Sequence, residues 1–220
     1  MKKYLITALL SMTMLMSLVP TAFAADSNYT ECMTAISEQK EIQAQAHSVA
    51  NLLRQQGYDD SNTYIQAAKS LWNDAQKEIN AYQKLSRYTD EDIRILATMV
   101  YYEAGQTTEQ LRQYVAQVAV NRVLDSRFPN TIYGVITQPG QYAGKYATEE
   151  ATQKIKNNDA ANGTYHWLNC VSSAKMALME RVDMPRNVLF QANFTQGTGV
   201  WKAVHFDSGW FASTSYFCYA

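Results

Sequence analysis

The chain has 220 residues, a formal net charge of −1 and no run of basic residues. This near-neutral balance argues against a nucleic acid or an anionic membrane surface as a partner. The length is enough for one ordinary domain and a smaller appendage, and the many aromatic residues favour a protein with a packed interior.

The first 24 residues have the pattern of a secretory signal peptide. Lys2 and Lys3 precede an apolar run over residues 4–19, and Ala22-Phe23-Ala24 supplies a small-residue cleavage site. The apolar run is too short to span a membrane, and no later segment approaches the roughly 18 apolar residues that a membrane helix needs. We therefore expect an exported protein with no integral membrane segment after cleavage.

The three cysteines are Cys32, Cys170 and Cys218. In an oxidising compartment one disulfide is expected, and we predict it between Cys170 and Cys218 because both belong to the same predicted domain. Cys32 would then be a free thiol or an intermolecular link.

Residues 26–88 predict an antiparallel helical hairpin, because two helical patterns meet at Gly57, the one glycine between residues 28 and 88. The predicted inward positions are Ala35, Gln39, Ile42, Ala46, Val49 and Leu53 in the first helix, and Tyr64, Ala68, Leu71, Ala75, Tyr82 and Leu85 in the second. His47 and Trp72 are interpreted as packing or surface residues. The hairpin carries no recognisable chemistry, and a spacer, a self-association element and a docking arm for a partner protein all fit its sequence.

Residues 89–220 predict a second domain that begins with a short helix. Thr89 and Asp92 form a capping-box pattern, and Gly105 predicts a left-handed stop after Ala104. Ile93, Leu96 and Val100 recur on one face, and Glu103 continues that series. A glutamate at this position either turns outward from the last turn, pairs with an arginine such as Arg94 or Arg122, or has a raised pKa, which makes it a proton donor near neutral pH.

The rest of this domain predicts a mainly helical fold with a small irregular or β portion. A second helix starts at Thr107 or Thr108 and runs to about Asp125, a short helix ends near residue 136, and an irregular loop or small hairpin covers residues 137–146. Helices are then expected over residues 149–158 and 170–180. The aromatic tail after residue 188 suits short extended segments.

Several kinds of catalytic site find little support. The chain has three histidines and no His-Glu-x-x-His motif, so neither the pair His166 and Cys170 nor the pair His205 and Asp207 makes a convincing zinc site. A Cys170 nucleophile with His205 as its base lacks a supporting pattern. A serine elbow and a phosphate-binding glycine loop are absent. No cofactor or metal is expected.

The remaining chemistry is that of a carboxyl group acting on a substrate that binds aromatic and amide side chains. Such side chains gather in the second domain, where Tyr101, Tyr102, Tyr142, Tyr146, Trp201 and Trp210 can stack on sugar rings, and Gln117, Asn121, Gln141 and Asn193 can bond hydroxyl or acetamido groups. Together with Glu103 in an exported protein, they favour polysaccharide cleavage.

Four stretches in order resemble the signatures of the spore cortex-lytic cell wall hydrolases, the SleB/CwlJ-type family. They are Val100-Tyr101-Tyr102-Glu103-Ala104-Gly105, Val115-Ala116-Gln117-Val118-Ala119-Val120-Asn121-Arg122-Val123, Phe128-Pro129-Asn130-Thr131-Ile132-Tyr133-Gly134-Val135-Ile136 and Gly140-Gln141-Tyr142. The chain departs from the family pattern at Gln106, Ala143 and Ser215, where the family often has an acidic residue, a serine and a histidine. The resemblance covers about residues 90–220 and leaves the hairpin outside.

The resemblance implies a compact lysozyme-like domain that cuts the glycan strands of peptidoglycan, in a protein associated with the cell wall. Glu103 matches the family's catalytic glutamate, and Tyr102, Gln117, Asn121, Gln141 and Tyr142 are the expected substrate-binding residues. Members described as lytic transglycosylases need one acid, because the muramic acid's own 6-hydroxyl attacks the anomeric carbon. The alternatives left open are simple hydrolysis, a non-catalytic glycan-binding or adaptor module, and an N-acetylmuramoyl amidase.

Overall fold

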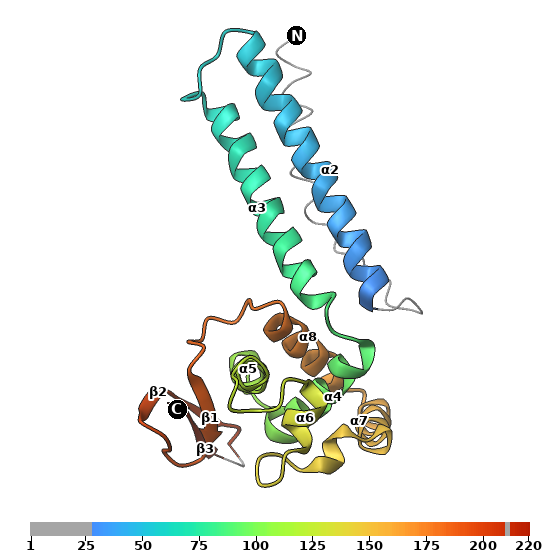
Figure 1. Cartoon of the computed structure of the whole chain (residues 1–220). Helices are drawn as coiled ribbons and strands as arrows, with labels where there is room; N and C mark the ends of the chain where they lie inside the picture. The colour runs from blue at the N-terminus through green and yellow to red at the C-terminus, as the bar shows by residue number, and fades with distance from the viewer. Residues whose placement is uncertain (1–27, 210–211) are drawn as a thin grey trace. The chain divides into compact units, whose positions relative to one another are not determined.

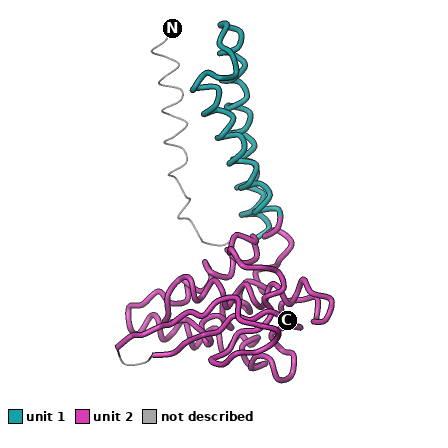
Figure 2. The backbone as a smooth tube through the Cα atoms, turned by 90° about the vertical axis from the view of Figure 1, so that its left-hand side faces the viewer, with its two compact units in different colours: residues 1–83 teal, residues 84–220 magenta. Residues whose placement is uncertain are grey.

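The computed structural model of the chain describes residues 28–209 and 212–220 (Figure 1). The predicted signal peptide, residues 1–24, and the candidate Trp210 therefore lie outside the described residues. The chain divides into two compact units between Gln83 and Lys84 (Figure 2). Within the described ranges, no helix has the length and apolar content needed to cross a membrane.

The first unit is built from two helices, α2 (Asn28–Gln55) and most of α3 (Thr63–Leu85), as the sequence predicts. Gly57 lies between them with φ +86°, a left-handed conformation that glycine adopts at little cost. Asp59 caps the following turn, since its carboxylate accepts hydrogen bonds from the backbone N–H and the hydroxyl of Ser61. The reversal therefore follows from local turn chemistry.

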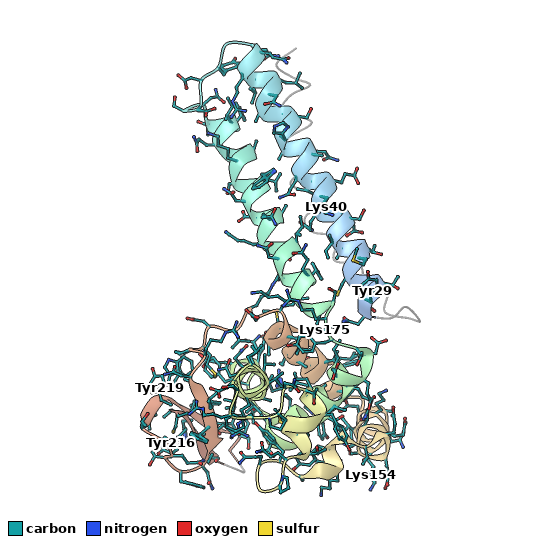
Figure 3. All side chains as sticks on the ribbon, viewed as in Figure 1. Tyr29, Lys40, Lys154, Lys175, Tyr216 and Tyr219 are labelled. Carbon is teal, nitrogen blue, oxygen red and sulfur yellow. The ribbon has the colours of Figure 1, made fainter. Side chains whose placement is uncertain are left out.

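The interior of this unit is made of small and aliphatic side chains. Its cluster contains Ala46, Ala50 and Leu53 from α2 and Ile65 and Ala68 from α3. The predicted inward position of Tyr64 is wrong: Tyr64 is 45% exposed, and its neighbour Ile65 is fully buried in its place. Side chains such as Tyr29 and Lys40 project outward from α2 (Figure 3).

The second unit is organised around α5 (Glu109–Val123), which packs against both α4 (Asp90–Ala104) and α8 (His166–Leu178). The capping box at the start of α4 is present, because Thr89 and Asp92 exchange side-chain and backbone hydrogen bonds. α5 is buried on nearly all sides from Leu111 to Arg122, and its other neighbours include the sheet, through β1 (Figure 1). A helix buried all round marks the centre of a core.

Shorter elements cover one side of α4. These are α6 (Ile132–Thr137), the 3-10 helix η1 (Gly144–Ala147) and α7 (Glu149–Asn162). Residues 137–146, where a loop or small hairpin is predicted, contain the start of η1 and no strand. Arg94 on α4 fixes this region, since its guanidinium donates to the carbonyl oxygens of Ala147 at 2.7 Å and Thr148 at 3.0 Å.

The tail forms a three-stranded antiparallel sheet from β1 (Val188–Ala192), β2 (Gly199–Asp207) and β3 (Ala212–Tyr219). The order is β1-β3-β2, so the last strand in the chain lies between the other two. The prediction of a mainly helical fold with a small β portion is thereby confirmed, whereas the lysozyme-like comparison stays a prediction.

Two predictions about the second unit are wrong. Cys170 and Cys218 are free buried thiols, as is Cys32. Phe217 packs against Tyr114 of α5, so its strand neighbour Cys218 points to the opposite face of the sheet, away from the helices that surround Cys170. Gly105 is not left-handed: it continues the helix with φ −57°, and an added Cβ would lie 2.9 Å from the Tyr101 ring.

Candidate active site

Glu103 lies in the last turn of α4, where the row of buried side chains on the inner face of the helix ends. Ile93, Leu96 and Val100 are buried as predicted, but the next buried residue is Ala104, four positions after Val100. Glu103 is exposed, so the expectation that it continues the buried face is wrong. The helix places its carboxyl at the border between core and solvent.

The surroundings of this carboxyl still favour its protonated form. Burial by neighbouring protein atoms raises the pKa of Glu103 above its ordinary value, and a hydrogen bond from the Tyr146 side chain partly opposes the rise. The exposed surface and the raised pKa are compatible, because the side chain opens onto a cleft whose walls exclude part of the surrounding water. A neutral carboxyl of this kind can donate a proton.

An open cleft of about 360 Å³ adjoins Glu103, within the size range of sites that hold small ligands. It lies between the helical layer and the sheet, and it contains both polar and apolar groups. Its lining residues are Glu103, Thr107, Leu111, Gln191, Ala192, Asn193, Phe206, Ser213 and Ser215. In this lining, Glu103 is the only carboxyl group among the described residues.

The cleft exists because the inner face of β3 changes along the strand. Phe217 is fully buried and meets the Tyr114 ring edge-on, with 5.3 Å between ring centroids, so this end of the strand packs tightly on α5. Ser215 and Ser213 follow on the same face, since strand side chains alternate. Both serines line the cleft. Two small hydroxyls leave a gap where larger side chains would close the interface.

Two tyrosines stand beside Glu103. The rings of Tyr102 and Tyr146 are stacked, with centroids 4.7 Å apart and planes 4° apart. Tyr102 is 39% exposed and precedes Glu103 in the last turn of α4. Burial and the nearby Glu103 charge both raise the pKa of Tyr146.

Tyr142 is held near the acid by Arg122. The guanidinium of Arg122 lies 5.2 Å from the Tyr142 ring centroid and donates a hydrogen bond of 2.7 Å to the Leu189 carbonyl. Burial raises the pKa of Tyr142, Arg122 lowers it and Glu103 raises it, so the hydroxyl lies within the field of the catalytic candidate. Arg122 therefore joins the loop that carries Tyr142 to the start of the sheet.

Gln117 and Asn121 have structural partners in place of the expected glycan. Asn121 is 1% exposed and donates hydrogen bonds of 3.0 Å to the carbonyl oxygens of Pro185 and Val188. Gln117 is 3% exposed and donates to the side chain of Asn121 at 2.9 Å. Neither side chain can reach a ligand in the cleft without rearrangement of the core, so we assign both to the joint between α5 and β1.

The remaining predicted residue, Gln141, is exposed and does not line the cleft. The sequence prediction missed most of the sheet side of the cleft, although Asn193 was among its wider set of sugar-binding candidates. Ser213 and Ser215 alternate with larger residues in a strand, and this pattern was the one available signal. Trp201, another candidate, packs its ring edge-on against Tyr114, 5.2 Å between centroids.

The thiol alternative receives no support from the geometry. Burial raises the pKa of Cys170 to about 12, so this thiol is not ionised near neutral pH and cannot act as a nucleophile. In the described part of the chain, no three His, Cys, Asp or Glu side chains are arranged to hold a metal ion.

Comparisons with known proteins point to one family. Residues 106–210 match the family model described as Cell Wall Hydrolase. Two curated relatives from Bacillus cereus, both named Spore cortex-lytic enzyme, are 36% identical over 81 residues, which cover 34% of this chain and 31% of each relative. The chain thus spans about a third of the length of these relatives. No solved structure matches the chain. The matched segment begins after Glu103.

Proposed function

We propose that the chain cleaves the glycan strands of peptidoglycan with Glu103 as the general acid, because residues 106–210 match the family model described as Cell Wall Hydrolase. The observation that carries this proposal is the position of Glu103: it has a raised pKa and stands at the rim of a cleft that other polar side chains line. The printed name of the relatives, which refers to spore cortex, supports the same substrate class.

The cleft lining also favours a mechanism with one acid. Glycosidases of the usual kind need a second carboxyl group about 5–9.5 Å from the first. Among the described residues that line this cleft, Glu103 is the only carboxyl. We therefore propose a lytic transglycosylase in preference to a hydrolase.

Cleavage proceeds in two steps. Glu103 gives its proton to the glycosidic oxygen between a muramic acid and a glucosamine unit, and the bond from that oxygen to the anomeric carbon breaks. The 6-hydroxyl oxygen of the same muramic acid then bonds to the anomeric carbon. Its proton passes to the Glu103 carboxylate, which restores the acid and leaves a 1,6-anhydro sugar.

The groups opposite Glu103 suit a sugar substrate. Gln191, Asn193 and the two cleft serines offer hydrogen-bond donors and acceptors, and Phe206 offers an apolar surface for a ring face. Tyr102 and Tyr142 remain proposed contacts on the helical side. Because the substrate lies outside the cytoplasm, we also propose that the chain is exported and acts in the cell wall.

The test compares wild-type protein with Glu103→Gln on purified peptidoglycan, with products identified by mass spectrometry. We expect anhydro-muropeptides from the wild type and a loss of roughly 10²–10⁴-fold in rate for the variant, while sedimentation with peptidoglycan is retained. Glu109→Gln is the matched control, since Glu109 is exposed and lies outside the cleft.

Other reaction products would indicate a different activity. Reducing muropeptides with one more water would mean hydrolysis, and free peptide stems would mean amidase activity. A wild-type protein that sediments with peptidoglycan and releases nothing would leave only a binding module. Spore cortex and vegetative wall, tested side by side, would identify the better substrate.

We further propose that the first unit serves self-association or docking. The supporting observation is that Tyr29, Tyr64 and Trp72 are between 41% and 59% exposed on its two helices. Sedimentation velocity of the wild type and of Trp72→Ser measures self-association directly. A monomer at all concentrations would rule that part out.

A further inference from the structure

One face of the sheet forms the cleft wall that Glu103 meets, and all three strands contribute to it. Gln191 on β1 pairs with Phe217 on β3, and Ser213 on β3 pairs with Phe206 on β2. Phe217 and Ser213 share a face, because strand side chains alternate and the two lie four positions apart. Tyr114 covers this face at Phe217, and the cleft opens over the part that continues to Ser213.

The polar side chains of this wall take no part in holding the fold together. In the described part of the chain, none of the four has a hydrogen-bond partner: they are Gln191, Asn193, Ser213 and Ser215. By contrast, the buried amide of Gln117 donates to Asn121 at 2.9 Å. Side chains without an internal partner bond to solvent, so a ligand can take over these bonds without breaking any contact within the protein.

An acetamido group is the sugar substituent that complements these side chains best. The side-chain amide of Asn193 or Gln191 carries N–H donors and a carbonyl acceptor, and an acetamido group carries an N–H and a carbonyl oxygen. The two groups can therefore bond each other reciprocally. A free amine is charged near neutral pH and offers donors alone, so it can make only half of this pair. Phe206 lines the same wall and offers an apolar surface to the acetamido methyl.

We propose that this wall is a subsite for the acetamido groups of the glycan, in which Asn193 and Gln191 select N-acetylated sugars over N-deacetylated ones. This inference rests on the proposed function, because it takes the glycan of peptidoglycan as the ligand. The subsite and Glu103 line one cleft, so a sugar held by its acetamido group lies beside the acid. Removal of acetyl groups from the glycan should therefore weaken both its binding and its cleavage.

The first experiment measures binding without cleavage, in the Glu103→Gln protein, by isothermal titration calorimetry. The ligands are a tetrasaccharide of N-acetylglucosamine and N-acetylmuramic acid units, its N-deacetylated form, and that form acetylated again. Adding Asn193→Ala should weaken binding of the acetylated ligand by about 3- to 10-fold, the effect of one lost hydrogen bond. Binding of the deacetylated ligand should change less, because its pair with the amide is already incomplete. The ligand acetylated again should behave as the original.

The second experiment measures cleavage of acetylated and deacetylated glycan by the wild type, Asn193→Ala and Gln191→Ala. Each variant should reduce the wild-type preference in kcat/KM by about 3- to 10-fold, mainly through a higher KM on acetylated glycan. The charge of the free amine affects all three proteins alike, so it cancels when their preferences are compared. Gln153→Ala is the control, since Gln153 is an exposed amide outside the cleft lining.

The outcomes separate this inference from the proposed function. Asn193 is exposed, so Asn193→Ala should melt at the same temperature as the wild type, and weaker binding would then report the lost contact. An equal preference for acetylated glycan in the wild type and both variants overturns the subsite, even if the enzyme is active. If the wild type releases no product but Asn193→Ala selectively weakens binding of the acetylated ligand, the proposed cleavage fails and the subsite stands.

Discussion

The two units differ in what they bury. The first buries mainly small aliphatic side chains such as Ala46, Ala50 and Ala68 along one seam between two helices. The second buries a complete helix, α5, together with polar side chains that bind backbone groups of the tail. A contact between two helices needs only apolar residues at helical spacing. A cleft also needs two layers, here the helices and the sheet, that pack tightly at one end and separate at the other.

This difference indicates which of the two units can hold a functional site. In the first unit, each helix has one buried stripe, and the opposite faces carry solvated side chains. In the second, the packed pair Phe217 and Tyr114 lies next to the cleft serines, so a firm contact sets the width of the opening. The acid occupies the border of the packed region, where its pKa can be raised and a substrate can still arrive.

The largest expected effect comes from removing core volume in the second unit. Leu96 is fully buried in α4, so Leu96→Ala should lower the free energy of unfolding by about 3–5 kcal/mol. The equivalent change in the first unit, Leu53→Ala, should cost about 2–3 kcal/mol, because two helices can close a gap more easily than a multilayer core.

Hydrogen exchange read by mass spectrometry tests this contrast region by region. Leu96→Ala should speed exchange in residues 90–123 and leave residues 28–83 unchanged. Equal acceleration in both ranges would contradict the expectation that the two compact units unfold separately.

A smaller effect is expected from Asn121→Leu. The substitution keeps the branched shape of the side chain and removes three hydrogen bonds, so the Gln117 amide and the carbonyl oxygens of Pro185 and Val188 lose their partner. We expect a loss of about 2–4 kcal/mol in chemical denaturation. Activity should fall through displacement of β1, which carries Gln191 in the cleft wall. Retained stability with a selective rise in KM would instead restore Asn121 as a direct substrate contact.

The smallest effect concerns the acid itself. Because the folded protein raises the pKa of Glu103, the native state binds more protons than the unfolded state between the two pKa values. Stability therefore falls as the pH rises from the ordinary glutamate pKa through the raised one. Glu103→Gln should remove this loss, so its melting temperature should exceed that of the wild type near pH 7 and match it at low pH.

Thermal denaturation followed by circular dichroism over a pH series measures this difference. A variant that melts at the same temperature as the wild type at every pH would mean that Glu103 is not desolvated in the native state. Such a result would remove the physical basis for proton donation at neutral pH.

Local signals in the sequence predicted most helices. The capping box at Thr89 and the reversal at Gly57 depend on neighbouring residues, and the structure contains both. The apolar pattern failed at positions where packing against another helix decides which side chain is buried. Tyr64 and Ile65 are both apolar neighbours, and only the opposing helix selects Ile65 for the interior.

Apart from Asn193, the site could be predicted only on its helical side. The motif around Glu103 draws attention to the acid and to Tyr102, but the opposite wall comes from strands far along the chain. Asn121 has the composition of a ligand-binding residue, yet its amide binds backbone carbonyls that no local pattern reveals. The disulfide prediction failed for a related reason, since strand alternation sends Cys218 to the face away from α8.

The strand order has a consequence for how the protein matures. A chain leaves a ribosome or a secretion channel in sequence, so Glu103, β1 and β2 emerge before β3. β1 and β2 are each bonded to β3 and are not neighbours of each other. Until residues 212–219 arrive, neither outer strand has its partner and the serine wall of the cleft does not exist. Glu103 is therefore synthesised early, and the cleft beside it is completed late, when residues 212–219 pair with both outer strands.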